Sequence, residues 1–315
     1  MLFQMQGRKK NVVLFHRDFQ RFSGGHLKVW HYFCHVRESR SHEARVHFTV
    51  GSRLDETNPW FKANTPRNAE WNPTDADVLF AAGLDWGAIP ISNSLPVVNL
   101  IQGMLHSVPG DPRYAFLSRR AVRICVSEEV AEAVLATRRA NGPVFAIPNA
   151  IDHDLFPKPG SSRDIPLLIC GLKNPDLASR LEGCLAEQGL FAVAQTKHLD
   201  RGVFLSLVGR AKVAVFLPCR TEGCYLPALE AMAMGTLVVC PDCVGNRTFC
   251  RDGDNSFRPD YTLHAIEEAT LRACALSETD HDRMVSRGLQ QAQSRDLARE
   301  RRLFLDILEQ LPSLL

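Results

Sequence analysis

The chain has 315 residues, enough for about two domains, and a hydrophobic fraction of 45% that is ordinary for a globular protein. Its net charge of +2 gives no electrostatic reason to expect a nucleic-acid partner. No apolar run approaches a membrane span, and the N-terminus lacks the apolar core of a signal peptide. The ten cysteines are scattered, and Cys170 and Cys240 lie in apolar segments, so we expect reduced thiols in a cytoplasmic protein.

The first half of the chain alternates between short apolar segments and helical segments. We expect strands at 11–15, 44–50, 77–81, 96–101, 124–126 and 142–148, and helices at 27–36 and 128–137. Strands that alternate with helices are typical of a parallel, doubly wound sheet. We read Asp75 and Asp77, which mimic a metal-binding D-x-D, as a strand cap, because they lead into a strand of this pattern.

A glycine pair, Gly24-Gly25, follows the first predicted strand and precedes the first predicted helix. The start of a helix attracts anions, and glycine lets the backbone approach a phosphate closely, so this turn is a candidate phosphate site. Gln102 and His106 follow the strand at 96–101. Which of these two side chains faces a ligand is left open.

The second half begins after a segment rich in Pro, Gly and Ser at 153–164, which we interpret as a linker. We expect strands at 165–171, 191–195, 213–217 and 236–240, and helices at 177–188, 202–210, 226–234 and 296–311, with further helix from 263 broken near 277–280. Basic residues on one side of the last helix could touch an anionic membrane, but acidic residues interrupt them and favour a solvated face.

The stretch from 219 to 257 contains the strongest functional signal. Glu222 and Gly223 lie in a polar turn before the helix at 226–234, and the amides near Tyr225 and Leu226 start that helix. Such a turn favours anions, and Glu230, which we place about two turns into the helix, could accept hydrogen bonds from vicinal hydroxyls. Phosphate flanked by hydroxyl groups is the chemistry of a nucleotide sugar.

The motif E-G-x-x-L-P-x-L-E-A-M-A-x-G, followed by a strand and then by G-N-R and D-G-x-N, resembles the donor site of retaining GT-B glycosyltransferases of family 4 (group 1). The resemblance implies two Rossmann-like domains with doubly wound parallel sheets that face a central cleft. It implies an N-terminal acceptor-side domain at 1–152, a linker at 153–164, a nucleotide-sugar domain at 165–295, and a helix at 296–315 that returns toward the first domain.

The resemblance also implies roles for single residues. Glu222, Lys173 and His106 are the candidate catalytic residues. The candidate contacts to the nucleotide sugar are Glu230, Gly223, Cys224, Tyr225, Leu226, Gly24, Gly25, Lys197 and His198. The chain departs from the family at two places: Leu172 stands where the family has an arginine, and Gln102 stands nearest the strand end where the family has a histidine.

The implied reaction is transfer of a sugar from a nucleotide sugar to an acceptor hydroxyl with retention of anomeric configuration. The acceptor class stays open between a glycan, a lipid-linked acceptor and another hydroxyl compound, as does a peripheral contact with the inner face of a membrane. We expect no metal or other cofactor, because the single C-x-x-C at Cys240 and Cys243 lacks a second ligand pair. The alternatives are a GT-B sugar-nucleotide epimerase or phosphorylase, and a non-catalytic nucleotide-binding protein.

Overall fold

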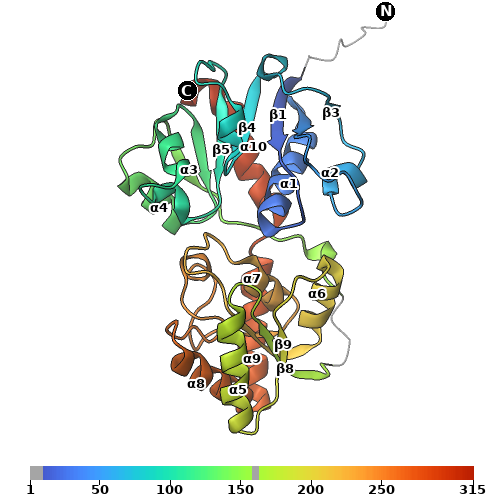
Figure 1. Ribbon diagram of the computed structural model, residues 1–315, viewed down its shortest axis with the longest axis vertical. Coiled ribbons are helices and arrows are strands. Elements are labelled where there is room, and N and C mark those ends of the chain that lie inside the picture. The colour runs from blue at the N-terminus through green and yellow to red at the C-terminus, as the bar shows by residue number, and fades with distance from the viewer. Residues whose placement is uncertain (1–9, 158–162) are drawn as a thin grey trace, which may run out of the picture. The chain divides into compact units, whose positions relative to one another are not determined.

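The computed structural model describes residues 10–157 and 163–315, so part of the predicted linker, 158–162, lies outside the described residues. The chain forms two compact units (Figure 1). Unit 1 comprises residues 1–149 and 298–315, and unit 2 comprises residues 150–297. No helix within the described ranges is long and apolar enough to span a membrane.

Unit 1 contains a seven-stranded parallel sheet with the order β3-β2-β1-β4-β5-β6-β7. Its strands are β1 (Asn11–Arg17), β2 (His42–Phe48), β3 (Arg67–Asn68), β4 (Val78–Ala82), β5 (Val97–Ile101), β6 (Val122–Cys125) and β7 (Val144–Ala146). The order reverses direction at β1, which is the doubly wound arrangement that the alternating sequence pattern predicts. β3 was not predicted, because two residues are too short to show a period.

The longer helices of unit 1 are α1 (Gly24–Arg37), α4 (Glu128–Ala136) and α10 (Leu297–Leu314). The single-turn helices α2 (Pro59–Lys62) and α3 (Pro112–Ala115) lie between α1 and α4 along the chain. The hydroxyl groups of Ser23 and Ser127 accept hydrogen bonds from backbone N–H groups of α1 and α4. The glycine pair is therefore not in the turn before the helix, as predicted, but in its first turn.

Buried charges connect α1 and α10 inside unit 1. Lys28 on α1 forms an ion pair with Glu300 on α10, and His35 Nε2 lies 2.9 Å from the second oxygen of Glu300. Burial alone would raise the pKa of Glu300, but Lys28 and His35 overcome it and hold that pKa near 2. Aromatic contacts surround this network, with Tyr32 4.7 Å from Phe304 between ring centroids.

Unit 2 contains a four-stranded parallel sheet with the order β11-β10-β8-β9. Its strands are β8 (Ile165–Cys170), β9 (Val193–Gln195), β10 (Ala211–Phe216) and β11 (Leu237–Val239), and its helices are α5 (Pro175–Glu187), α6 (Arg201–Gly209), α7 (Leu226–Ala233), α8 (Leu263–Cys274) and α9 (Glu278–Gln293). Alternate strand residues enter two different cores, as a sheet buried on both faces requires. One core includes residues of α6 and α7, and the other includes residues of α5, α8 and α9.

Candidate functional site

The loops that follow the strands of unit 2 lie together at the carboxyl edge of its sheet. Lys173 follows β8, Lys197 and His198 follow β9, and Glu222 follows β10. Ligands of open parallel sheets bind outside this edge, so the strand order brings most of the predicted site residues of unit 2 to the place where a ligand is expected.

A close backbone contact shapes the loop that carries Glu222. Gly245 accepts a hydrogen bond from Tyr225 N–H at 2.9 Å. A Cβ atom at Gly245 would lie 2.8–2.9 Å from the Glu222 carbonyl oxygen and from the amides of Cys224 and Tyr225. Only glycine fits such an approach. Gly245 was not among the predicted site residues, because the G-N-R motif does not show which segment packs against it.

The same contact changes the expected anion site. The amide of Tyr225 donates to Gly245, and the amide of Leu226 donates to the Cys224 carbonyl at 3.1 Å. Both amides are therefore occupied inside the protein, which contradicts their predicted role as free donors for phosphate.

Glu230 is the fifth residue of α7, one turn from its start rather than two, and only 2% exposed. Arg201, the first residue of α6, donates from both terminal nitrogens to the two carboxylate oxygens of Glu230, with a distance of 2.8 Å from Nη1 to Oε2. This two-pronged geometry is the strongest arrangement available to a guanidinium and a carboxylate. Arg201 was not among the predicted site residues, since its pairing depends on how α6 packs against α7.

Lys173 and Glu222 also form a pair, although a looser one. Lys173 Nζ lies 3.6 Å from Glu222 Oε1, and their side chains are 51% and 26% exposed. The structure thus brings two of the three predicted catalytic residues together. Lys197 and His198 are exposed and form no ion pair within the described chain.

A group of arginines at the carboxyl end of β11 adds positive charge to this edge. Asp242 receives hydrogen bonds from Arg247, and Arg258 lies 3.6 Å away. The hydrogen bonds from Arg247 hold the pKa of Asp242 below its usual value, despite the opposing effect of burial. Arg220 is also close enough to lower that pKa.

In unit 1, the glycine pair lies next to Gln102 rather than His106. A Cβ atom at Gly25 would be 3.4 Å from Gln102 Oε1, and Gln102 is half-buried. His106 lies in a short 3-10 helix, Met104–Ser107, and is 3% exposed. Burial and the nearby Arg113 lower the pKa of His106 to about 4, so its ring is neutral near pH 7.

A further polar network at the carboxyl end of β1 was not predicted. Arg17 donates to Asp85 Oδ2 at 2.7 Å and to His26 Nδ1 at 2.9 Å. Burial and the Arg17 charge lower the pKa of His26 to about 4, which matches its role as an acceptor. Arg17 ends β1, His26 lies in α1 and Asp85 follows β4, so no single segment of the sequence signalled this network.

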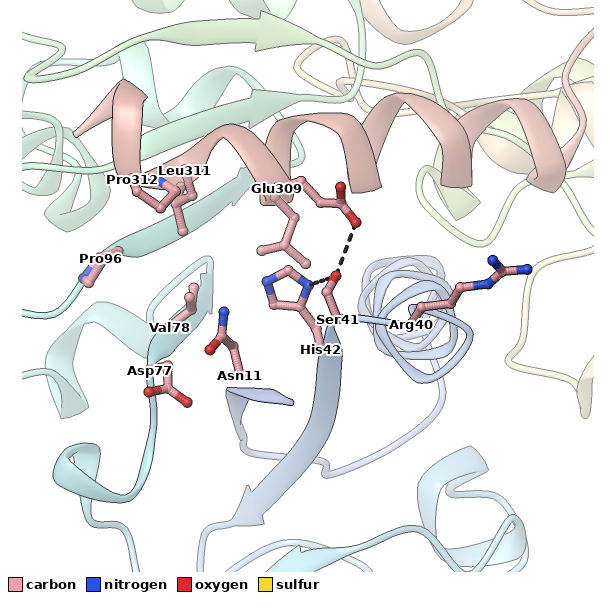
Figure 2. Close-up of a pocket in the computed structure, with 11 residues that line it drawn as sticks. Asn11, Arg40, Ser41, His42, Asp77, Val78, Pro96, Glu309, Leu311 and Pro312 are labelled. Atoms are coloured by element: carbon pink, nitrogen blue, oxygen red, sulfur yellow. Dashed lines mark hydrogen bonds between the residues drawn. The ribbon is translucent and has the colours of Figure 1, made fainter. Parts of the chain in front are cut away.

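A pocket of about 560 Å³ lies at the opposite edge of the unit 1 sheet (Figure 2). It is lined by residues at the amino ends of strands, including Asn11, His42 and Val78, and by the last turns of α10. Ser41 donates to Glu309 at 3.0 Å inside it. None of its lining residues is a predicted site residue. Asp77 there accepts a hydrogen bond from Val12 N–H at 2.7 Å, as expected for a strand cap.

The described residues contain no group of three or more His, Cys, Asp and Glu side chains that could hold a metal ion. Cys240, Cys243 and Cys250 are buried next to one another with free thiols. Burial raises the pKa of Cys240 well above its ordinary value, so this thiol is protonated near pH 7.

Residues 149–275 match the family model described as "Glycosyl transferases group 1". The matched segment includes Lys173, Arg201, Glu222, Glu230 and Gly245. No curated protein sequence matches the chain.

Solved structures share the fold of the whole chain. Anabaena HepE in complex with UDP and glucose has a TM-score of 0.75 at 14% identity, with 95% of this chain and 99% of that chain covered. A glycosyltransferase from Rickettsia africae has a TM-score of 0.72 at 12% identity, covering 96% and 99%. Sucrose-phosphate synthase from Thermosynechococcus elongatus has a TM-score of 0.70 at 13% identity, covering 96% and 100%. The predicted GT-B fold, with two Rossmann-like units, is thereby confirmed.

Proposed function

We propose that this protein transfers a sugar from a nucleoside diphosphate sugar to an acceptor hydroxyl and retains the anomeric configuration. The observation that carries the proposal is the presence of two ion pairs at the carboxyl edge of the unit 2 sheet, Lys173 with Glu222 and Arg201 with Glu230. We refer to these four residues as the cluster. The cluster lies within the segment that matches group 1 glycosyl transferases.

Three members of the cluster each suit one part of a nucleotide sugar. Negative charge develops on the leaving diphosphate as the glycosidic bond breaks, and Lys173 is a cation at the end of β8 that can compensate it. The Glu222 carboxylate can accept hydrogen bonds from hydroxyls of the sugar, and Glu230 can accept them from the ribose. The Anabaena structure that shares this fold contains UDP and glucose, which supports this class of ligand.

The family resemblance favours a route in which the acceptor attacks on the face of the departing diphosphate. The leaving phosphate oxygen then takes the acceptor proton, so the sugar keeps its configuration. Gly24, Gly25, Lys197 and His198 remain predicted contacts to the nucleotide sugar, and His106 remains a predicted catalytic residue. The acceptor stays open between a glycan, a lipid-linked acceptor and another hydroxyl compound.

A donor panel tests the proposal. The purified protein is incubated with UDP-, GDP- and ADP-sugars, each with and without a mixture of hydroxyl acceptors, and release of free nucleotide is measured. We expect release from one nucleotide class, increased by an acceptor and reduced in Glu222→Gln. Conversion of the sugar nucleotide without an acceptor would favour an epimerase, and a requirement for inorganic phosphate would favour a phosphorylase. Binding without turnover would favour a non-catalytic nucleotide-binding protein.

A further inference from the structure

The two carboxylates of the motif differ in how their partners hold them. Glu230 is 2% exposed and receives two hydrogen bonds from Arg201. Glu222 faces a single ammonium group at 3.6 Å, and Lys173 is half exposed. A buried bidentate pair is costly to break, whereas an exposed ion pair contributes little to stability. The Lys173–Glu222 pair is therefore the one that a ligand can open.

The backbone on both sides of this pair is held firmly. A Cβ atom at Gly171 would lie 2.3 Å from Ala178 Cβ, so the turn after β8 packs tightly on α5. Asn174 N–H donates to the Gly171 carbonyl at 2.9 Å and closes that turn around Lys173. On the other side, Gly245 packs against the Glu222 carbonyl. The pair can therefore open by side-chain rotation, without movement of either loop.

We infer that the diphosphate of the donor breaks the ion pair between Lys173 and Glu222 and binds the Lys173 ammonium group itself. The Glu222 carboxylate then becomes available to the sugar only when a diphosphate is bound. This inference rests on the proposed function. A compact ammonium group interacts more strongly with a diphosphate, which carries more than one negative charge, than with one carboxylate. Once released, Glu222 has uncompensated acceptor oxygens beside the bound diphosphate, where the hydroxyls of the attached sugar can donate to them.

The exchange has a consequence for recognition. When a free sugar binds, Lys173 still compensates the charge of the Glu222 carboxylate. A nucleotide sugar carries its own diphosphate, which breaks the Lys173–Glu222 ion pair. Glu222 also competes with the diphosphate for the same cation. Removal of the Glu222 charge should consequently strengthen the binding of a nucleoside diphosphate that carries no sugar.

Calorimetric titration tests the exchange. UDP, GDP and ADP are titrated into the wild-type protein, and the one that binds is then titrated into Glu222→Gln, Lys173→Met and the double variant. We expect Glu222→Gln to tighten binding about twofold to fivefold, the range that an exposed pair contributes. In the Lys173→Met background the same substitution should tighten binding much less, because only simple repulsion between Glu222 and the diphosphate remains.

The control is Glu187→Gln, which removes the same charge from the exposed last turn of α5 and should leave the affinity unchanged. Thermal melts confirm that each variant is folded. Unchanged or weaker binding in Glu222→Gln would overturn the inference, as would an equal gain with and without Lys173. If none of the three nucleotides binds the wild-type protein, the proposed function fails first, and that result is distinct from a failure of the exchange.

Discussion

At the scale of single residues, Glu230 is the most tightly constrained member of the cluster. Its carboxylate is buried and accepts hydrogen bonds from Arg201, so Glu230→Ala would break a buried ion pair and disturb folding. Glu230→Gln keeps the shape of the side chain. If Glu230 accepts hydrogen bonds from ribose hydroxyls, this variant should bind a nucleoside about 1.5–3 kcal/mol more weakly, as expected for hydrogen bonds to a charged group. Calorimetric titration of the nucleoside into Glu230→Gln, once a cooperative thermal melt has shown that the variant is folded, measures this loss. Unchanged affinity would contradict the assignment of Glu230 to the ribose.

Lys173 should act on turnover rather than on recognition of the nucleoside. The amides of Tyr225 and Leu226 are occupied within the protein, so we expect the charge of Lys173 to supply more of the compensation of the diphosphate than the sequence alone indicated. We expect Lys173→Ala to lower turnover at saturating donor by roughly 10²–10³, the scale of one lost transition-state donor. Binding of the free nucleoside, which has no phosphate, should barely change. Turnover within about threefold of the wild type would assign the role to another cation of this edge.

At the scale of elements, the packing of Gly245 against the Glu222 loop makes a prediction about a residue without a functional side chain. Gly245→Ala places a methyl group 2.8–2.9 Å from backbone atoms of that loop, so the loop must shift. We expect a loss of stability of about 1–3 kcal/mol, typical of overpacking, together with a lower kcat at saturating donor.

Gly183→Ala on α5 is the matched control for this substitution. The added methyl group meets no atom within 4 Å, and alanine favours a helix, so stability should stay equal or rise. Urea denaturation and initial rates measure both variants. An active, fully stable Gly245→Ala protein would show that the loop tolerates the shift.

The helices α1 and α10 are joined by Lys28, His35 and Glu300. Glu300→Ala breaks the buried ion pair with Lys28, so it should lower the free energy of unfolding by about 3–5 kcal/mol. Glu309→Ala, on the exposed side of α10, should cost less than about 1 kcal/mol. Chemical denaturation of the two variants compares them directly, and equal losses would contradict a special role for the buried charge.

The pH dependence of this contribution follows from the pKa of Glu300, which the fold lowers from 4.5 to about 2. A depressed carboxyl pKa adds stability that is fully present above the unfolded value and is lost as the pH falls through the folded value. The wild-type protein should lose this contribution between about pH 4.5 and pH 2, and Glu300→Gln should not show that part of the acid transition.

At the scale of the whole molecule, the prediction concerns stereochemistry and metal dependence. The product should keep the anomeric configuration of the donor, and a chelator should not abolish activity, because the proposed compensation comes from lysine and arginine side chains. NMR of the first-formed product and rates in EDTA measure the two properties. An inverted linkage would remove the retaining mechanism, and a loss of activity restored by a divalent cation would require a metal in the donor complex.

The sequence predicted local properties well, because these depend on neighbours in the chain. Alternation of apolar and helical segments placed β1, β4, β5, β8 and β10 within a few residues of their observed positions. The E-x₇-E spacing located Glu222 and Glu230, and the GT-B fold followed from the same motif. The short strand β3 was missed because two residues carry no periodic signal.

Contacts between distant segments were decided only by the tertiary structure. The pairing of Arg201 with Glu230 depends on the packing of α6 against α7, and that of Lys173 with Glu222 on the adjacency of β8 and β10. The Tyr225 amide donates a hydrogen bond to the carbonyl of Gly245, 20 positions later in the chain. No local sequence pattern reveals this contact. The amino-acid sequence by itself thus determined which residue types and elements this protein has. Packing decided which charges meet, because the distance between two side chains is set by the folded core and not by their spacing along the chain.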